Sequence, residues 1–290
     1  MKSIKYLVIG SLLLFISNFS NAQVISATEF MKMYKSDKNL KVIDAGKSNV
    51  YNAFHIKNAV NIPHATLYKT GPVPALILGS AELAKIMGNH GISETNTLVV
   101  YDENSQKYSS RVYWILKYLG VKNVWILHKD LTDWRKARIP VTSSSTGIKK
   151  TTFSPHVNAS VYTILEKEQV KNDVIVDCRT NDEYLGTTEN SKGHIPGAIN
   201  LNYLSILKKD GSFKPKDEIV KILSEHGLSK DQNIVLYCQT SIRASVVFAA
   251  LKGILGWPNV KLYDGAYVAW THSGMPLSKK PLAKPMISQR

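Results

Sequence analysis

Cysteine is scarce in this sequence, with only Cys178 and Cys238 among 290 residues. Two thiols exclude a disulfide-stabilised scaffold and a zinc or iron–sulfur site built from several cysteines. Glycine and proline are also few, at 17 and 11, which excludes collagen-like and low-complexity chains. A hydrophobic content of 44% argues against general disorder, and the length predicts two domains of ordinary size.

Long apolar runs are missing after the first 22 residues. Two lysines precede the apolar stretch 6–16, and the small residues Ser20 and Ala22 precede a cleavage point before Gln23. This layout is typical of a secretory signal peptide, and the run is shorter than the roughly 20 residues that span a bilayer. We expect residues 1–22 to be removed and the mature protein to be exported, most simply to a bacterial periplasm, without stable membrane insertion. An uncleaved N-terminal anchor is the alternative.

Acidic residues are the minority charge, with 22 Asp and Glu against 37 Lys and Arg, giving a net charge of +15. The predicted signal peptide holds two lysines and no acid, so its removal lowers the charge to +13. The sequence shows no basic helix and no nucleic-acid-binding motif, so a nucleic-acid partner is not expected. The spread lysines indicate a solvated surface that also steers small anions towards a site.

The chain repeats itself at a nearly constant spacing. Asp102 and Cys238 follow similar apolar runs 136 positions apart, and segment 55–61 (HIKNAVN) corresponds to 194–200 (HIPGAIN). Such a long repeat indicates a duplicated domain rather than a solenoid. The predicted order along the chain is a signal peptide at 1–22, a first domain at 23–141, a linker at 142–152, a second domain at 153–280 and a C-terminal tail at 281–290.

Short β-rich runs alternate with helical patterns within each half. In the second half we predict strands at 174–176, 234–237 and 260–263, with helices at 217–226 and 244–252. This alternation predicts an α/β fold in which each domain is a parallel sheet flanked by helices on both faces. Sites in such sheets form at the carboxyl ends of strands, where Asp177 and Cys238 both lie.

Cys238 stands between a predicted buried strand and a helix. The first amides of a helix have no acceptor within it and the helix dipole is positive there, so an anion is favoured at this point. A nearby arginine further favours a thiolate. A buried, inert cysteine is the alternative reading of the same context. The predicted loop that would surround an anionic sulfur consists of Gln239, Thr240, Ser241, Ile242 and Arg243.

Several motifs of the second half together resemble the rhodanese family of sulfurtransferases. They are 176–179 (VDCR), 183–186 (EYLG), 193–200 (GHIPGAIN) and the cysteine loop, in the order found in that family. The tandem arrangement is similar to that of two-domain members and extends over nearly the whole mature chain.

The resemblance implies two rhodanese-like domains and a catalytic Cys238 that carries sulfane sulfur as a persulfide. The loop amides would stabilise the persulfide and Arg243 would assist an anionic donor, before a thiol acceptor or cyanide takes the sulfur. Asp177, Arg179 and His194 would brace the site. No metal or organic cofactor is called for, and the chain is expected to act as a monomer.

The loop departs from its relatives in ways that bear on the donor. Gln239 and Thr240 are neutral, Ser241 replaces a common glycine, and Glu183 stands where members that hold a substrate carboxylate or sulfonate often have arginine. These features weaken mercaptopyruvate as the donor. Thiosulfate remains the default expectation, with a persulfide or a partner protein as alternatives.

The first half and the second cysteine are not expected to carry the reaction. Asp102 stands at the position of Cys238 and cannot hold sulfane sulfur. Tyr108, Arg111 and Trp114 either line the cleft between the domains or belong to helix surface and core. Cys178 is either a small buried residue or a resolving thiol that pairs with Cys238 on oxidation.

Two other functions compete with sulfur transfer. Tyrosine phosphatases use five residues between cysteine and arginine, whereas only four lie between Cys238 and Arg243, and the smaller loop suits one sulfur better than a phosphate. A non-enzymatic binding or sulfur-carrier module is the other alternative, and the first half fits it better than the second.

Overall fold

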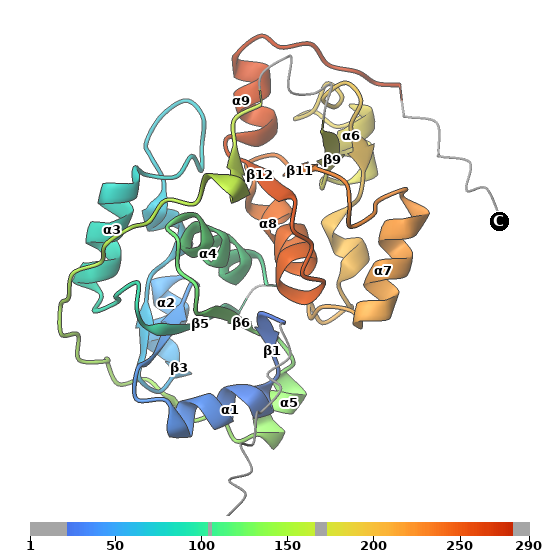
Figure 1. Cartoon of the computed structure of the whole chain (residues 1–290). Helices are drawn as coiled ribbons and strands as arrows, with labels where there is room; N and C mark the ends of the chain where they lie inside the picture. Colours follow the sequence, from blue (N-terminus) through green and yellow to red (C-terminus); the bar gives the residue numbers. More distant parts are fainter. Residues whose placement is uncertain (1–21, 104–105, 166–172, 281–290) are drawn as a thin grey trace, which may run out of the picture.

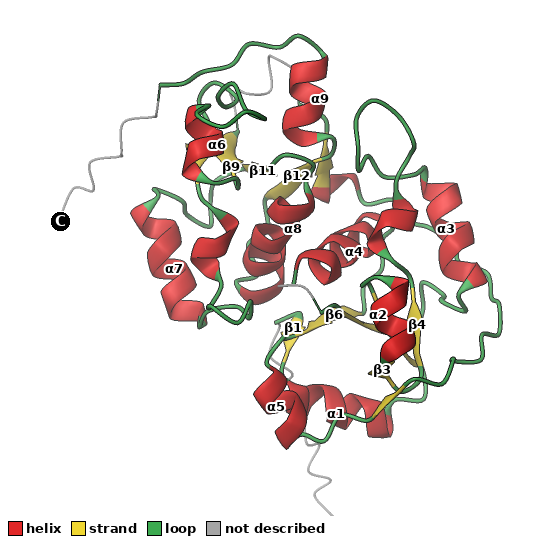
Figure 2. Ribbon diagram, turned by 180° about the vertical axis from the view of Figure 1, so that it is seen from behind, coloured by secondary structure: helices red, strands yellow, loops and turns green. Residues whose placement is uncertain are grey.

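The computed structural model of the chain describes residues 22–103, 106–165 and 173–280. Within these residues the chain forms two α/β domains, each built on a five-stranded sheet (Figure 1, Figure 2). The fold class expected from the sequence is therefore confirmed. The predicted signal peptide, apart from Ala22, and the predicted C-terminal tail lie outside the described residues.

The first sheet is entirely parallel and has the strand order β1-β6-β5-β2-β4. A short antiparallel pair, β3 with β7, lies beside it. The strands of this domain are β1 (Val24–Ile25), β2 (Leu40–Asp44), β3 (His55–Ile56), β4 (Ala59–Asn61), β5 (Thr97–Tyr101), β6 (Val124–Leu127) and β7 (Val141–Thr142). Its helices are α1 (Ala27–Ser36), α2 (Ser48–Ala53), η1 (His64–Leu67), α3 (Ser80–Asn89), α4 (Lys107–Tyr118) and α5 (Leu131–Lys136).

The second sheet is also parallel and has the order β10-β9-β11-β12-β8. Its strands are β8 (Tyr162–Thr163), β9 (Val174–Asp177), β10 (Ile199–Asn200), β11 (Ile234–Tyr237) and β12 (Val260–Tyr263). The helices are η2 (Ala159–Val161), α6 (Asn181–Leu185), η4 (Tyr203–Ile206), α7 (Lys216–Glu225), α8 (Ile242–Phe248), the π-helix η5 (Ala249–Ile254) and α9 (Ala266–His272). This strand order, from β8 to β10, repeats that of the first domain from β1 to β4.

Alternate residues of the buried strands face different cores, as β geometry requires. In β5, Val100 belongs to the large core that includes α3 and α4, whereas Val99 faces the core beneath α1 and α5. In β11, Leu236 faces the large core with α7 and α8, and Val235 faces the smaller core under α9. Both sheets are thus covered by helices on each face, which explains their continuous apolar runs.

The large core continues from one domain into the other through α4 and α8, which pack directly against each other (Figure 1). Beside this contact, Arg111 of α4 forms an ion pair with Asp264 of the second domain, with Nη2 and Oδ1 2.7 Å apart and both side chains buried. Arg111 and Trp114 are fully buried, and Trp114 donates to the carbonyl of Val161 at 2.8 Å. Of the two readings of Arg111 and Trp114, the structure supports core and domain contact rather than a cleft lining.

The connection between the domains lies along the first domain. Thr142, the first residue of the predicted linker, pairs with His55 in the β3–β7 ribbon. Further on, the N–H of Thr151 donates to Gly88 at 2.9 Å, and a Cβ on Gly88 would lie only 2.5 Å from the Thr151 carbonyl oxygen. The glycine is therefore needed for this close approach. No helix within the described part of the chain has the length and apolar character needed to cross a membrane.

Candidate active site

Cys238 follows β11 directly and is almost fully buried, at 1% exposure. Its carbonyl oxygen accepts a hydrogen bond from the N–H of Tyr267 at 3.0 Å, and the carbonyl of Gln239 accepts one from Val268 at 3.2 Å. The first turn of α9 therefore holds the start of the cysteine loop. These two loop carbonyls are directed towards α9.

Ser241 ends the loop in the left-handed conformation, with φ of 68°, and caps α8. Glycine adopts this conformation without penalty, whereas a residue with a Cβ is strained in it. The serine gains compensating contacts, because its hydroxyl donates to the carbonyl of Tyr263 and its own carbonyl accepts from the Ser245 hydroxyl at 2.8 Å. Thr240 and Ile242, on either side of it, are half-buried.

Arg243 lies in the first turn of α8 and is held by Glu183 of α6. Two hydrogen bonds of 2.7 Å join Nη1 and Nη2 of the guanidinium to the two carboxylate oxygens. Such two-point pairing fixes the guanidinium plane. Glu183 is itself fixed, because Thr180 and Glu183 form a capping box at the start of α6.

The charges of this pair depend on each other and on Cys238. Burial would raise the pKa of the Glu183 carboxyl, but the hydrogen bonds and charge of Arg243 outweigh it and lower that pKa to about 2. Burial would lower the pKa of Arg243, whereas Glu183 and the neighbouring Cys238 raise it above its usual value. The site therefore holds a permanent cation, Arg243, beside Cys238. The Glu183 carboxylate balances most of the charge of this arginine.

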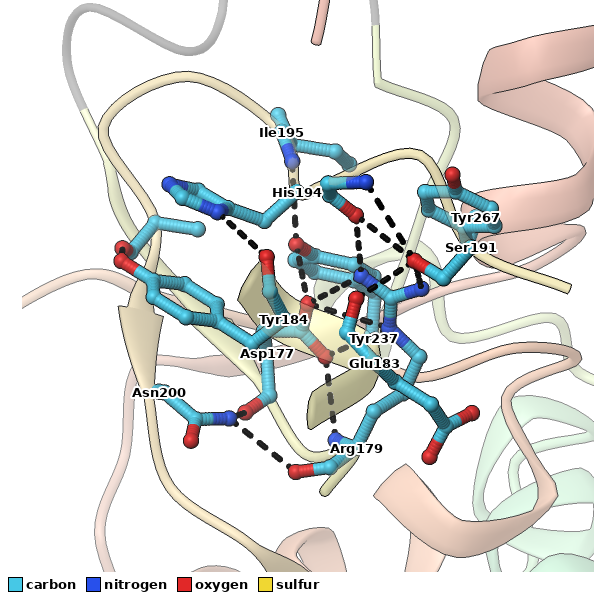
Figure 3. A network of polar contacts seen from close by, with 12 residues as sticks. Asp177, Arg179, Glu183, Tyr184, Ser191, His194, Ile195, Asn200, Tyr237 and Tyr267 are labelled. Atoms are coloured by element: carbon cyan, nitrogen blue, oxygen red, sulfur yellow. Dashed lines mark hydrogen bonds and ion pairs between the residues drawn. The ribbon is translucent and has the colours of Figure 1, made fainter. Parts of the chain in front are cut away.

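A buried network below the site joins Asp177 to Arg179 (Figure 3). Nη2 of Arg179 lies 2.6 Å from Oδ2 of Asp177, and both side chains have no exposed surface. The guanidinium also donates to the Ser191 hydroxyl at 3.1 Å and to the Gly193 carbonyl at 2.8 Å. This pairing satisfies a charge that burial would otherwise make costly.

Two tyrosines complete the network. The hydroxyl of Tyr237 donates to Oδ2 of Asp177 at 2.7 Å and accepts from the N–H of Ile195 at 3.1 Å. The ring of Tyr267 lies under the guanidinium of Arg179, with 4.0 Å from Cζ to the ring centre. Since Tyr237 immediately precedes Cys238, the network fixes the strand end that presents the sulfur.

His194 takes part in the turn between α6 and β10. Its Nδ1 lies 2.7 Å from the carbonyl oxygen of Tyr184, and its ring stacks on the Tyr184 ring with centres 3.6 Å apart. Burial lowers the pKa of the imidazole. These contacts are structural, and together with Asp177 and Arg179 they brace the elements around the loop.

Cys178 and Cys238 are both free thiols and both buried. Burial, and then the neighbouring Cys238, raises the pKa of the Cys178 thiol well above its usual value. A thiol that stays protonated is a poor nucleophile. This favours the reading of Cys178 as a small buried side chain over that of a resolving thiol.

Asp102 occupies the position of Cys238 in the first domain. Its Oδ2 accepts a hydrogen bond of 2.5 Å from the N–H of Ser109, in the first turn of α4. The loop of this domain is one residue longer, because its left-handed residue is Gln106, four positions after Asp102, whereas Ser241 is three positions after Cys238. The π-helix η5 then holds one extra residue in the second domain, which restores the repeat spacing of 136 at Trp134 and Trp270.

The sequence places Cys238 and Arg243 in one loop but does not reveal the partner of Arg243. In the sequence, Glu183 is notable only because similar proteins often have arginine at that position. Nothing in the sequence indicates that Glu183 contacts Arg243, which lies 60 positions further along the chain. The sequence also does not identify Tyr237 and Tyr267 as members of this network. The only feature of the sequence that could have indicated their role is their position, Tyr237 at the end of a strand and Tyr267 at the start of a helix. Among the described residues, no group of three or more His, Cys, Asp or Glu side chains is arranged to hold a metal ion.

Comparison with known proteins agrees with this geometry. The rhodanese-like domain matches twice, over residues 26–137 and 158–273. A Haloferax volcanii protein named as a thiosulfate sulfurtransferase is 30% identical over 217 residues, covering 70% of this chain and 76% of that protein. A sulfur carrier protein of Thermus thermophilus is 27% identical, covering 90% and 98% of the two chains.

Solved structures give the same assignment. SseA of Escherichia coli, described as a 3-mercaptopyruvate sulfotransferase, superposes with a TM-score of 0.76 at 27% identity, covering 85% of this chain and 99% of that one. The chain belongs to the rhodanese family of sulfurtransferases, with two copies of the domain in tandem.

Proposed function

We propose that the chain transfers a sulfane sulfur from a small anionic donor to a thiol acceptor through a persulfide on Cys238. The observation that carries this proposal is the position of Cys238 at the end of β11, followed by a loop that ends at a fixed arginine. The thiolate is the nucleophilic form of cysteine, and Arg243 places a permanent cation beside this sulfur.

The proposed reaction has two displacement steps. The Cys238 thiolate attacks the outer sulfur of thiosulfate, a new S–S bond forms, and the original S–S bond breaks as sulfite leaves with the electron pair. An acceptor thiolate, or cyanide in an assay, then attacks the outer sulfur of the persulfide. The Cys238 thiolate is released with its electron pair and is ready for the next cycle.

The first domain supports the idea that the loop holds an anion. There the Asp102 carboxylate accepts a hydrogen bond from the N–H of Ser109 in the first turn of α4. This turn corresponds to the start of α8 in the second domain. In the second domain no acidic residue directly follows β11, and the Cys238 and Gln239 carbonyls are engaged by α9. We expect the amides of the loop and of the first turn of α8 to donate to a persulfide anion, because the first amides of a helix have no acceptor within it.

The direct test is thiocyanate formation from thiosulfate and cyanide by the full-length chain. We expect turnover by the wild type and none above background by Cys238→Ala. Cys178→Ala is the matched control, because it removes the other buried thiol, and it should keep most of the activity. Activity that survives in Cys238→Ala, or is lost only in Cys178→Ala, would contradict the proposal.

Thiosulfate is proposed as the first donor to test, with support from the name of the Haloferax relative and from the basic surface. Glu183, however, already balances the charge of Arg243, which disfavours a dianion. We therefore expect Glu183→Gln to lower the KM for thiosulfate about two- to fivefold, the range that a partly exposed charge produces. A raised KM would instead mean that the loss of a fixed Arg243 orientation outweighs the gain in positive charge.

A sulfur carrier is the second candidate function, favoured by the Thermus relative that carries this name. A carrier takes one sulfur per chain and passes it to a particular partner, whereas an enzyme turns over many times with small acceptors. The amount of acceptor persulfide formed, measured against protein concentration, separates them. A yield that stops at one sulfur per chain with several acceptors would favour the carrier.

Export to a periplasm is proposed on the layout of residues 1–22 alone. Mass analysis of the protein recovered from its native host should give a mature chain that begins at Gln23. A chain that retains residues 1–22 would favour the uncleaved anchor.

A further inference from the structure

A cavity of about 190 Å³ lies in the first domain, at the carboxyl ends of β2 and β5. It is separate from the cysteine loop, which belongs to the second domain. The polar residues among those that line it are Asp44, His55, Tyr101, Asp102, Glu103 and Lys129, and the proposed sulfur transfer uses none of them.

The second domain shows what fills the corresponding space there. Asp177 pairs with the guanidinium of Arg179, and Tyr237 donates to the same carboxylate. In the first domain the aspartate is Asp44 and the tyrosine is Tyr101, whose hydroxyl accepts from Ile56 at 3.1 Å just as Tyr237 accepts from Ile195.

The arginine has no counterpart in the first domain, because Gly46 stands two positions after Asp44 where Arg179 stands two positions after Asp177. The backbone contacts of the two turns are otherwise alike: the N–H of Gly46 donates to Asp44 at 2.8 Å, and that of Arg179 to Asp177 at 3.0 Å. The cavity is therefore the space that an arginine side chain fills in the other copy.

The carboxylate of Asp44 is left buried without a cation. It is 5% exposed, and within the described ranges it forms no ion pair. Burial raises the pKa of Asp44 to about 6 despite hydrogen bonds from Tyr101 and Gly46. Glu103 adds a second carboxylate beside Asp44. A Cβ placed on Gly46 would lie 1.9 Å from Oε2 of Glu103 and 2.9 Å from Oδ1 of Asp44. Both acidic groups would gain from a bound cation.

His55 is a further polar group in the cavity wall. The imidazole is 2% exposed, lines the cavity, and stacks on the Tyr51 ring at 3.7 Å. Its Nδ1 lies 2.7 Å from the Tyr51 carbonyl oxygen, so Nδ1 carries the hydrogen and Nε2 is an acceptor. Nε2 is buried and has no hydrogen-bond partner among the described residues. Nε2 of His194 in the second domain is likewise buried without a partner, so this feature is common to both copies.

The rim of the cavity is apolar and open. Phe54, Leu131 and Val141 line it and expose more than half of their side-chain surface, and Trp134 packs behind them. Among the described lining residues Lys129 is the one lysine or arginine, and its ammonium group is bonded to the Glu103 carbonyl at 2.7 Å. A cation with a short apolar chain fits this combination.

We propose that this cavity binds a small molecule with a guanidinium or amidinium group, which would take the place that the Arg179 guanidinium takes in the second domain. The flat cation would pair with Asp44, and its chain would lie against Leu131 and Val141. The first domain would then be a ligand-binding domain joined to a sulfurtransferase domain.

Ethylguanidinium is the probe, and calorimetric titration of the full-length chain is the measurement. We expect saturable binding at one site and a loss of about tenfold or more in affinity for Asp44→Asn, because a buried charge pair loses one partner while the shape is kept. Glu218→Gln removes an exposed carboxylate on α7 and is the charge-matched control, with unchanged affinity.

A second variant, Gly46→Arg, places a tethered guanidinium in the same space and should abolish binding. Gly46 has an ordinary backbone conformation, and the atoms nearest to a Cβ placed there belong to the movable Glu103 side chain and to the Asp44 carboxylate, with which an arginine would pair. Thiocyanate formation should be unchanged in all three variants. No saturable binding to the wild type, or equal binding to the wild type and Asp44→Asn, would overturn the proposal.

Discussion

At the scale of single residues, the site depends on the contacts that run from Glu183 through Arg243 to Cys238. The carboxylate keeps the guanidinium in one orientation, and the guanidinium places a positive charge beside the sulfur. An arginine without this partner would have many rotamers, so its charge would be less well placed for the reaction.

The lowered pKa of Glu183 gives a pH-dependent contribution to stability. Because the folded pKa is about 2 against an ordinary value of 4.5, the stabilisation is complete above pH 4.5 and disappears as the pH falls towards 2. Its size is about 2 kcal/mol after allowance for partial solvent screening. We expect the wild type to be more stable than Glu183→Gln at pH 7, with the difference narrowing below pH 4.5.

Urea unfolding of both proteins from pH 7 to about pH 3 measures this contribution. The comparison isolates Glu183, because all other acidic groups titrate in both chains. A difference that stays constant over this range would show that the carboxylate is not coupled to Arg243 as the geometry indicates.

At the scale of elements, the cysteine loop is fixed at both ends by neighbouring elements. The amides of α9 hold its start, and Ser241 holds its end through the carbonyl of Tyr263 at the end of β12. The sulfur is therefore presented by the elements packed around β11, and not by the loop alone.

Substitution of Ser241 separates its hydrogen bond from its backbone strain. Ser241→Ala loses the bond to Tyr263 but keeps the left-handed conformation, so we expect a loss of about 1–2 kcal/mol in unfolding free energy. Ser241→Gly loses the same bond but relieves about 1 kcal/mol of strain, and should be less destabilised. Chemical unfolding of the two variants is the measurement; an alanine variant as stable as the glycine variant would argue against strain at this position.

The same elements show where sequence reasoning reaches its limit. The strands predicted at 234–237 and 260–263 have the bounds of β11 and β12, because continuous apolar runs identify buried strands. The helix predicted at 244–252 instead begins at Ile242 and becomes a π-helix after Phe248. Neither the left-handed start at Ser241 nor the extra residue of η5 leaves a periodic signal.

For the site, the sequence locates Cys238, its loop and the bracing residues Asp177, Arg179 and His194 near one sheet edge. The sequence does not show that Glu183 pairs with Arg243. It also does not reveal the cavity beside Asp44, at the position that the Arg179 side chain fills in the second domain. Both features depend on contacts between distant segments, which follow from packing and not from local pattern.

At the scale of the whole molecule, the two domains share one hydrophobic core and a buried ion pair. Asp264 accepts from Arg111 and from the N–H of Ile77 at 3.1 Å, so both of these partners belong to the first domain. Arg111 also donates to the carbonyl of Ala75 at 2.8 Å and lies over the Trp114 ring. The domains are thus expected to unfold together.

Removal of one member of the Arg111–Asp264 ion pair should weaken the coupling between the two domains. For Asp264→Asn we expect a loss of about 3–5 kcal/mol, because the Arg111 charge remains buried without its counterion. Scanning calorimetry should show a lower unfolding temperature or two separate transitions. The double variant Arg111→Met with Asp264→Leu should recover part of the loss; an unchanged single transition in Asp264→Asn would show that the pair does not couple the domains.

The central claim is that Cys238 carries the transferred sulfur. Intact and peptide mass analysis after incubation with thiosulfate, without an acceptor, tests it most directly. We predict one added sulfur atom on the peptide that contains Cys238, its loss on addition of cyanide, and the same result in Cys178→Ala. No added sulfur with thiosulfate or any other sulfane donor, or sulfur found on Cys178 instead, would contradict this claim.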